Sequence, residues 1–208
     1  MPHLLDPVFV NLVAALPVGQ HQVEVPNAAW ADRCAAAGLT PLHTALFAGR
    51  PTIQISRDWL HHAAVPDELR CLAVLLWAYP NGARGHEQDW LAQLPSISQA
   101  AAAPAASWDE YYDRLRAFDH LRIPTISKLA CFFGQVFVRL PALILDQRII
   151  TVLQSGQWAE LLRFQSVTAA NAHHSYVGYL DCLHALAARS KTQAEQWELF
   201  LSTHALSF

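Results

Sequence analysis

The sequence lacks two features that would place it at a membrane. Its longest apolar runs, such as LAVLLWAY at 72–79, are far shorter than the roughly 20 residues that a membrane-spanning helix needs. The first ten residues, MPHLLDPVFV, contain no lysine or arginine and include Asp6, which argues against a secretory signal. We therefore expect no membrane contact and a cytoplasmic location.

Clustered metal ligands and phosphate-binding loops are also missing from the sequence. The four cysteines are scattered without any CxxC pair, which argues against an iron–sulfur cluster or a structural zinc. Histidine pairs at 61–62 and 173–174 are not accompanied by an HExxH pattern. There is no glycine-rich phosphate loop and no GxSxG motif. We therefore expect no metal and no cofactor.

Lysine is scarce in this chain: of its 14 basic residues only Lys128 and Lys191 are lysines. The net charge is −3, which argues against DNA binding through overall charge, because phosphate contacts need cations. Residues 114–148, however, hold six basic and two acidic residues, a local charge of +4. Such a patch is typical of a surface that binds an anionic partner, although ordinary solvated helix ends are an equal alternative.

The composition favours a helical protein with a large core. Hydrophobic residues make up 53% of the chain and charged residues only 15%. Alanine-rich, periodic segments predict an all-α fold with at most a short strand near 52–55. We expect a monomer with one domain, divided into helical lobes at about 1–105 and 106–208. The Ala- and Pro-rich stretch 99–107 is either the linker between the lobes or the frayed start of a helix.

Capping residues predict where several helices begin. Ser56 can cap a helix that follows it. Ser107 and Glu110 match the S-x-x-E capping box and predict a helix that ends near residue 121. Thr192 and Glu195 match the same pattern ahead of a last helix.

Lys128 lies in the apolar segment PTISKLACFFGQVFVRLPALILDQRIITVL, which spans 124–153. We expect a helix from about residues 125–128 to residue 139, ended by Pro141, and then a helix that has Asp146 as its N-cap. Lys128 and Asp146 would then both lie near the N-terminal ends of consecutive helices and close to one cleft.

This placement would change the chemistry of both side chains. The partial positive charge of a helix N-terminus and the apolar neighbours of Lys128 both disfavour an ammonium group, so its pKa should fall. A neutral lysine amine can form a Schiff base, which an arginine cannot do because it stays protonated. Asp146, capped by backbone N–H groups, should stay ionised and stabilise a cation.

The spacing of the two residues carries a family resemblance. Asp146 follows Lys128 by eighteen residues, in the run LDQRIITVL. This arrangement resembles the core of the helix-hairpin-helix DNA glycosylase superfamily, in which a hairpin ends in a catalytic lysine and a catalytic aspartate heads the next helix. WAYPNGARG at 77–85 and SKLACFFG at 127–134 are similar to motifs of a divergent bacterial branch labelled as 8-oxoguanine DNA glycosylases. The resemblance covers about 70–150 and implies a two-lobed helical fold with the active-site cleft between the lobes.

The resemblance implies roles for the matching residues. Lys128 would attack C1′ of a flipped-out modified nucleotide, while Asp146 would assist proton transfer and stabilise the cationic sugar; a Schiff base and strand nicking by β-elimination would follow. The turn before Lys128 reads LRIPTIS and has no glycine, so Thr125 and Ser127 would supply hydroxyl and N–H donors to the DNA. The other implied contacts to DNA or to the flipped base are Trp77, Tyr79, Asn81, Arg84, Phe132 and Arg148.

The implied partner is double-stranded DNA that carries a modified base. That base is either 8-oxoguanine, in DNA repair, or a hypermodified base such as the glucosylated cytosine of phage DNA, in antiviral defence. Simpler interpretations are that Trp77, Tyr79 and Phe132 are packing residues and that Asp146 is only a helix cap. The alternative function is a non-catalytic helical module with a decayed site that binds DNA or a protein. A lysine-dependent aldolase is a weaker third class, because the chain lacks the strands of the usual barrels.

Overall fold

The computed structural model describes residues 1–82 and 87–207 of the chain. This part is mostly helical, which confirms the predicted fold class. The α-helices are α1 (Pro7–Ala14), α2 (Ala31–Ala36), α3 (Thr40–Phe47), α4 (Arg57–His62), α5 (Asp67–Ala78), α6 (Glu87–Ala92), α7 (Leu94–Ala102), α8 (Trp108–Arg116), α9 (Ile123–Phe132), α10 (Gln147–Ser155), α11 (Ala172–Ser190) and α12 (Ala194–Thr203). Short 3-10 helices are η1 (Val18–Gln20), η2 (Asn27–Ala29), η3 (Ala159–Phe164) and η4 (Ala205–Ser207). Among the described residues, no helix combines the length and the apolarity needed to cross a bilayer.

Two antiparallel pairs of short strands accompany the helices. The strand expected near 52–55 is β2 (Thr52–Ser56), and its partner is β1 (Gln22–Pro26), with Gln22 opposite Ser56. Because β1 begins opposite the end of β2, next to the start of α4, the backbone N–H of Arg57 bonds to the carbonyl of His21 at 3.0 Å. The β1–β2 ribbon therefore places His21 beside Arg57, although 36 positions separate them in the sequence.

The prediction of a helix that continues to residue 139 is wrong, because α9 ends at Phe132. Gly134 takes a left-handed φ of 67°, and the N–H of Gln135 bonds back to the carbonyl of Ala130, which is how a glycine ends a helix. The chain then forms the hairpin of β3 (Val136–Phe137) and β4 (Leu140–Pro141). Its two turn residues have positive φ, as tight hairpins require.

The capping predictions are mostly confirmed. The hydroxyls of Ser56 and Ser107 each accept a backbone N–H at 3.1 Å, and the Asp146 carboxylate caps α10. The predicted cap at Thr192 is wrong: its hydroxyl lies 2.8 Å from that of Ser190, and Gln193 and Gln196 form the capping box of α12. The stretch 99–107 is only partly a linker, because α7 continues to Ala102.

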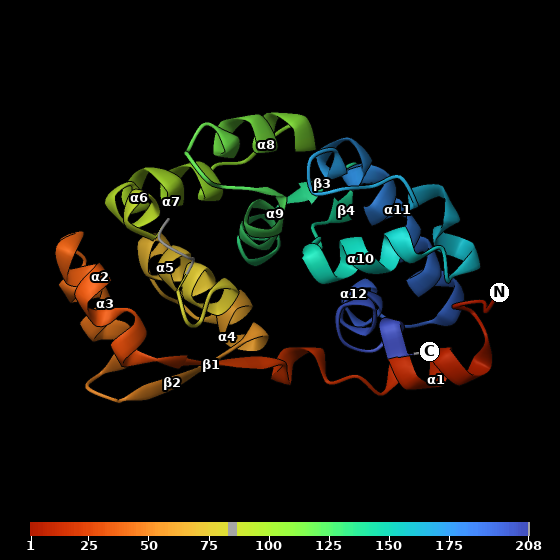
Figure 1. Ribbon diagram of the computed structural model, residues 1–208, viewed down its shortest axis with the longest axis horizontal. Helices are drawn as coiled ribbons and strands as arrows, with labels where there is room; N and C mark the ends of the chain where they lie inside the picture. The colour runs from red at the N-terminus through yellow and green to blue at the C-terminus, as the bar shows by residue number, and fades with distance from the viewer. Residues whose placement is uncertain (83–86, 208) are drawn as a thin grey trace.

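The helices flank a central one, α9 (Figure 1). Helices α2 to α7 lie on one side of α9 above the β1–β2 ribbon, and α10, α11 and α12 lie on the other side. Although it comes first in the sequence, α1 packs against α12. The division into lobes at about residue 105 stays a prediction.

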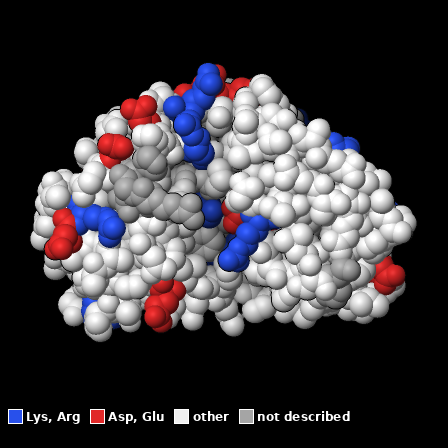
Figure 2. Space-filling model, in the orientation of Figure 1, with Lys and Arg blue, Asp and Glu red and all other residues white. Residues whose placement is uncertain are grey.

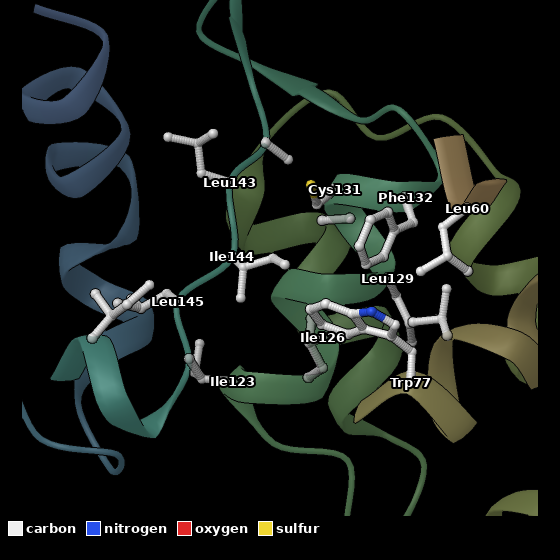
Figure 3. Packing of buried hydrophobic residues seen from close by; sticks show 14 of the residues in the cluster. Leu60, Trp77, Ile123, Ile126, Leu129, Cys131, Phe132, Leu143, Ile144 and Leu145 are labelled. Carbon is white, nitrogen blue, oxygen red and sulfur yellow. The ribbon is translucent and has the colours of Figure 1, made fainter. Parts of the chain in front are cut away.

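Packing holds α9 in place on both sides. Every residue of α9 except Pro124 is buried. Figure 3 shows Ile126, Leu129 and Phe132 of α9 on the side of Trp77 and Leu60, whereas Ile144 and Leu145 lie on the opposite flank. Each fully buried side chain of this kind contributes about 1.5–3 kcal/mol. Lys128 is therefore carried by one of the most firmly packed helices of the protein.

Candidate active site

Lys128 is a buried basic residue in the second turn of α9, with 7% of its surface exposed. Its ammonium donates to the carbonyl oxygen of Pro124 at 3.3 Å and lies 3.8 Å from Oδ2 of Asp146. It also lies 5.9 Å from the centre of the Trp77 ring. The two residues expected to work together are therefore neighbours in space.

The pKa of Lys128 is lowered, as expected from its apolar surroundings. Desolvation by burial is the largest cause. The negative charges of Asp146 and Glu198 oppose this effect, whereas Arg57 and Arg148 add to it. The helix N-terminus is a weaker cause than expected, because Lys128 lies beyond the first turn, where the helix dipole acts.

The two oxygens of the Asp146 carboxylate make different contacts. Oδ1 accepts the backbone N–H groups of Arg148 at 3.0 Å and of Ile149 at 3.1 Å, which caps α10. Oδ2 is the oxygen that faces the ammonium of Lys128. The cap fixes the side chain, so the free oxygen is held in position toward the lysine.

A cavity of about 320 Å³ opens over these two residues. Its lining comes from β1, α4, α5, α9, α10 and α12, so segments from most of the chain meet at this place. The lining residues are His21, Val23, Arg57, Trp77, Ala78, Pro80, Lys128, Asp146, Arg148, Ser202 and Thr203. Figure 2 shows basic and acidic atoms side by side at a hollow near the centre of this face.

Arg57 is a cavity residue that the sequence did not reveal. It is almost fully buried, and its Nη2 donates to Oε1 of Glu198 at 2.5 Å. The other carboxylate oxygen of Glu198 accepts the backbone N–H of Ile144 at 2.9 Å. Desolvation alone would lower the pKa of Arg57, but the Glu198 carboxylate outweighs it, so the guanidinium stays charged.

His21 is the second cavity residue without a sequence signal. Its Nδ1 accepts a hydrogen bond from Nε of Arg57 at 3.3 Å, and its ring meets Trp77 edge-on at 5.5 Å. Burial, together with the nearby charges of Arg57 and Arg148, lowers the pKa of His21 to about 4, although Asp146 opposes this. The ring is therefore neutral at physiological pH, with its Nε2 proton available to a ligand.

The structure brings four of the predicted site residues to this cavity: Lys128, Asp146, Trp77 and Arg148. Arg148 is exposed at the start of α10. Asn81 is exposed in the turn that follows Pro80. Arg84 lies outside the described residues.

The other predicted contacts point into the protein. The hydroxyls of Thr125 and Tyr79 lie 2.7 Å apart. Ser127 is fully buried, and its hydroxyl accepts the backbone N–H of Leu145 at 3.0 Å. Phe132 is 1% exposed and packs between the rings of His61 and Trp77. These four side chains do not line the cavity.

Potential metal ligands meet elsewhere. Among the described residues, one group of three, His61, Cys131 and Glu195, has ligand atoms close enough to share an ion, and it lies outside this cavity.

Comparison with known proteins identifies the family. Searches of curated proteins and of solved structures found no match. A family model described as "Putative 8-oxoguanine DNA glycosylase OGG-like protein" matches residues 16–202, and this region includes Lys128 and Asp146 as well as His21 and Arg57. The match confirms the resemblance seen in the sequence and extends it from 70–150 to most of the chain. The chain therefore belongs to the family that this model describes.

Proposed function

We propose that the protein is a DNA N-glycosylase with lyase activity that uses Lys128 as its nucleophile. One observation carries this proposal: a buried lysine amine with a lowered pKa faces a cavity of about 320 Å³ and lies 3.8 Å from a capped aspartate. A cavity of this size is within the range of small-ligand sites. A modified base flipped out of double-stranded DNA is the ligand that we propose for it.

The proposed reaction starts with the neutral amine of Lys128. Its nitrogen attacks C1′ of the flipped nucleotide, the bond from C1′ to the base breaks, and the base leaves with a proton. The negative charge of Asp146 stabilises the positive charge that develops on the sugar. The bond between C1′ and the ring oxygen then opens to give a Schiff base. Loss of a proton from C2′ expels the 3′ phosphate and nicks the strand.

The cavity wall offers donors for the base. Nη1 of Arg57 and Nε1 of Trp77 are buried and have no hydrogen-bond partner among the described residues, although both side chains line the cavity. A buried donor without a partner costs about 1–3 kcal/mol. We propose that oxygen acceptors on the flipped nucleotide approach these donors when the site closes around it. Both candidate bases, 8-oxoguanine and glucosylated cytosine, carry such acceptors.

Borohydride trapping tests whether Lys128 forms a Schiff base with DNA. The protein is incubated with duplex DNA that contains an abasic site or a modified base, and the Schiff base is reduced to a stable adduct. We expect the adduct with the wild type and with Lys191→Gln, which changes the only other lysine, but not with Lys128→Gln. An adduct of undiminished yield in Lys128→Gln would refute the proposal. Absence of any adduct, with unchanged DNA affinity in Lys128→Gln and Asp146→Asn, would instead support the non-catalytic module.

A substrate panel decides between repair and antiviral defence. Purified protein is incubated with an 8-oxoguanine duplex and with intact phage DNA that contains glucosylated hydroxymethylcytosine, and the released bases are measured. Release of 8-oxoguanine alone would exclude the antiviral function. Release of the glucosylated cytosine alone would exclude 8-oxoguanine repair.

A further inference from the structure

The helices that build the proposed active site carry a second set of polar side chains, one helical turn away from the first. Helices α4, α9 and α12 supply Arg57, Lys128 and Glu198 to the proposed active site. Residues three or four positions apart lie on the same face of a helix. The same three helices therefore bring together a second group, His61, Cys131 and Glu195.

The atoms of this second group are close together. Nε2 of His61 lies 3.2 Å from Oε1 of Glu195, and Sγ of Cys131 lies 3.8 Å from the same oxygen. All three ligand atoms lie within 4.8 Å of one another. With usual zinc bond lengths, tetrahedral coordination separates nitrogen from oxygen by roughly 3.4 Å and sulfur from oxygen by roughly 3.6 Å. The separations of 3.2 and 3.8 Å are thus close to those of a zinc site.

We propose that His61, Cys131 and Glu195 form a zinc site with a water molecule as the fourth ligand. Zinc is favoured because a thiolate, an imidazole and a carboxylate are its usual ligands. On binding, the Cys131 thiol loses its proton to solvent and its sulfur bonds to the metal, while the neutral His61 ring donates its Nε2 lone pair. The thiolate and the carboxylate balance the two charges of the ion, so the partly buried site carries no net charge.

Solvent has a route to this site. A cavity of about 320 Å³ is lined by His61, by Phe132 and Phe133 at the end of α9, and by residues of α5 and α7. The His61 and Glu195 side chains are 22% and 30% exposed, whereas Cys131 is buried. The cavity therefore reaches the group from the side of His61.

The site would connect three helices that are distant in the sequence. Cys131 and Glu195, for example, are 64 positions apart. Bound zinc would stabilise the packing of α4 and α12 on α9, and thereby the position of Lys128 one turn away. The zinc site does not depend on the proposed glycosylase activity, and its test does not measure that activity.

Cobalt(II) tests the site, because a cobalt–thiolate bond gives a charge-transfer band in the near ultraviolet. The purified, chelator-treated protein is titrated with cobalt(II) and then with zinc(II). We expect one cobalt ion per chain, a thiolate band, and its loss when zinc displaces cobalt. The band should disappear in Cys131→Ser, and affinity should fall at least tenfold in His61→Ala and Glu195→Gln. His62→Ala is the matched control, because its side chain is 76% exposed and lies outside the group.

The outcomes separate the two proposals. Wild-type protein that gives no thiolate band, or a band that is kept in folded His61→Ala and Glu195→Gln, would overturn the zinc site, whatever the trapping experiment shows. His61→Ala and Glu195→Gln should both fold, because positions 61 and 195 are partly exposed. Circular dichroism verifies that they do. Lys128→Gln should bind cobalt with wild-type affinity, even though it forms no Schiff base. Zinc should also raise the Tm of the wild type and of His62→Ala, but not that of His61→Ala.

Discussion

Burial controls the protonation of single residues in the cavity. Lys128 and His21 both have lowered pKa values, and desolvation is the largest cause in each case. Arg57 also lines the cavity and remains charged through its pair with Glu198. The cavity thus holds two permanent cations, Arg57 and Arg148, beside two bases that are biased toward their neutral forms. This arrangement suits a lysine nucleophile.

The pH dependence of stability should reveal the lowered pKa of His21. Its pKa is about 4 in the folded protein and 6.5 as a free group, so the unfolded chain binds more protons between these values. Stability is therefore lost as the pH falls through this window. Allowing for the partial exposure of the ring, we expect a loss of about 1–2 kcal/mol between pH 7 and pH 5. Urea unfolding at both pH values measures it.

The control is a histidine on the surface. His21→Gln should remove this loss, whereas His62→Gln should keep it, because the His62 side chain is 76% exposed. An unchanged pH dependence in His21→Gln would show that other groups cause the loss.

Part of the site could be predicted from the sequence, and the reason lies in how its residues are connected. Lys128 and Asp146 belong to consecutive helices, so their spacing is a local signal. Arg57 reaches the site through a strand pair and binds Glu198 across 141 positions. No local pattern marks such contacts, because they depend on tertiary packing.

At the scale of one element, the cap of α10 can be separated from the chemistry of Asp146. Asp146→Asn keeps an acceptor for the N–H groups of Arg148 and Ile149 but removes the charge beside Lys128. We expect the free energy of unfolding to change by less than about 0.5 kcal/mol. The rate of base excision should fall by about 100- to 1,000-fold. Urea unfolding and single-turnover excision measure the two effects.

Ser107 provides the matching control, because it caps α8 outside the cavity. Ser107→Ala should cost about 1 kcal/mol of stability and leave the excision rate unchanged. A wild-type excision rate in Asp146→Asn would mean that Asp146 is a cap alone.

Several helix starts were predictable because a side chain makes a local bond there, although the Gln193–Gln196 capping box of α12 was missed. The caps at Ser56, Ser107 and Asp146 are of this kind. The end of α9 was missed because the apolar run QVFVRL continues beyond Gly134, and the left-handed turn at that glycine outweighed the run. Apolar periodicity indicates which residues are buried. It did not mark the boundary, because both the helix and the hairpin that follows it contain buried residues.

At the scale of the whole molecule, the basic residues of 114–148 differ in their partners and in their distance from the cavity. The exposed Arg116 pairs with Asp113 at 2.8 Å and Arg114 bonds to backbone carbonyls, and neither lines the cavity, whereas the exposed Arg148 does. A cation that neutralises a phosphate releases a counterion. We expect Arg148→Ala to reduce the slope of log affinity against log salt by about 1.

Binding measured over a range of salt concentrations gives this slope. Arg116→Ala should leave it unchanged, because that side chain lies outside the cavity and pairs with Asp113. Equal effects of the two substitutions would show that the whole basic window contacts DNA.

The Arg57–Glu198 pair has a consequence for synthesis of the chain on the ribosome. One partner precedes Lys128 in the sequence and the other follows it by 70 positions. The carboxylate that holds Arg57 and the backbone of Ile144 therefore reaches the cavity only after α12 has been translated. A nascent chain that already displays Lys128 still lacks this support, and contacts of such long range form late in folding. The reactive amine is thus assembled into its site only once nearly all of the cavity wall exists.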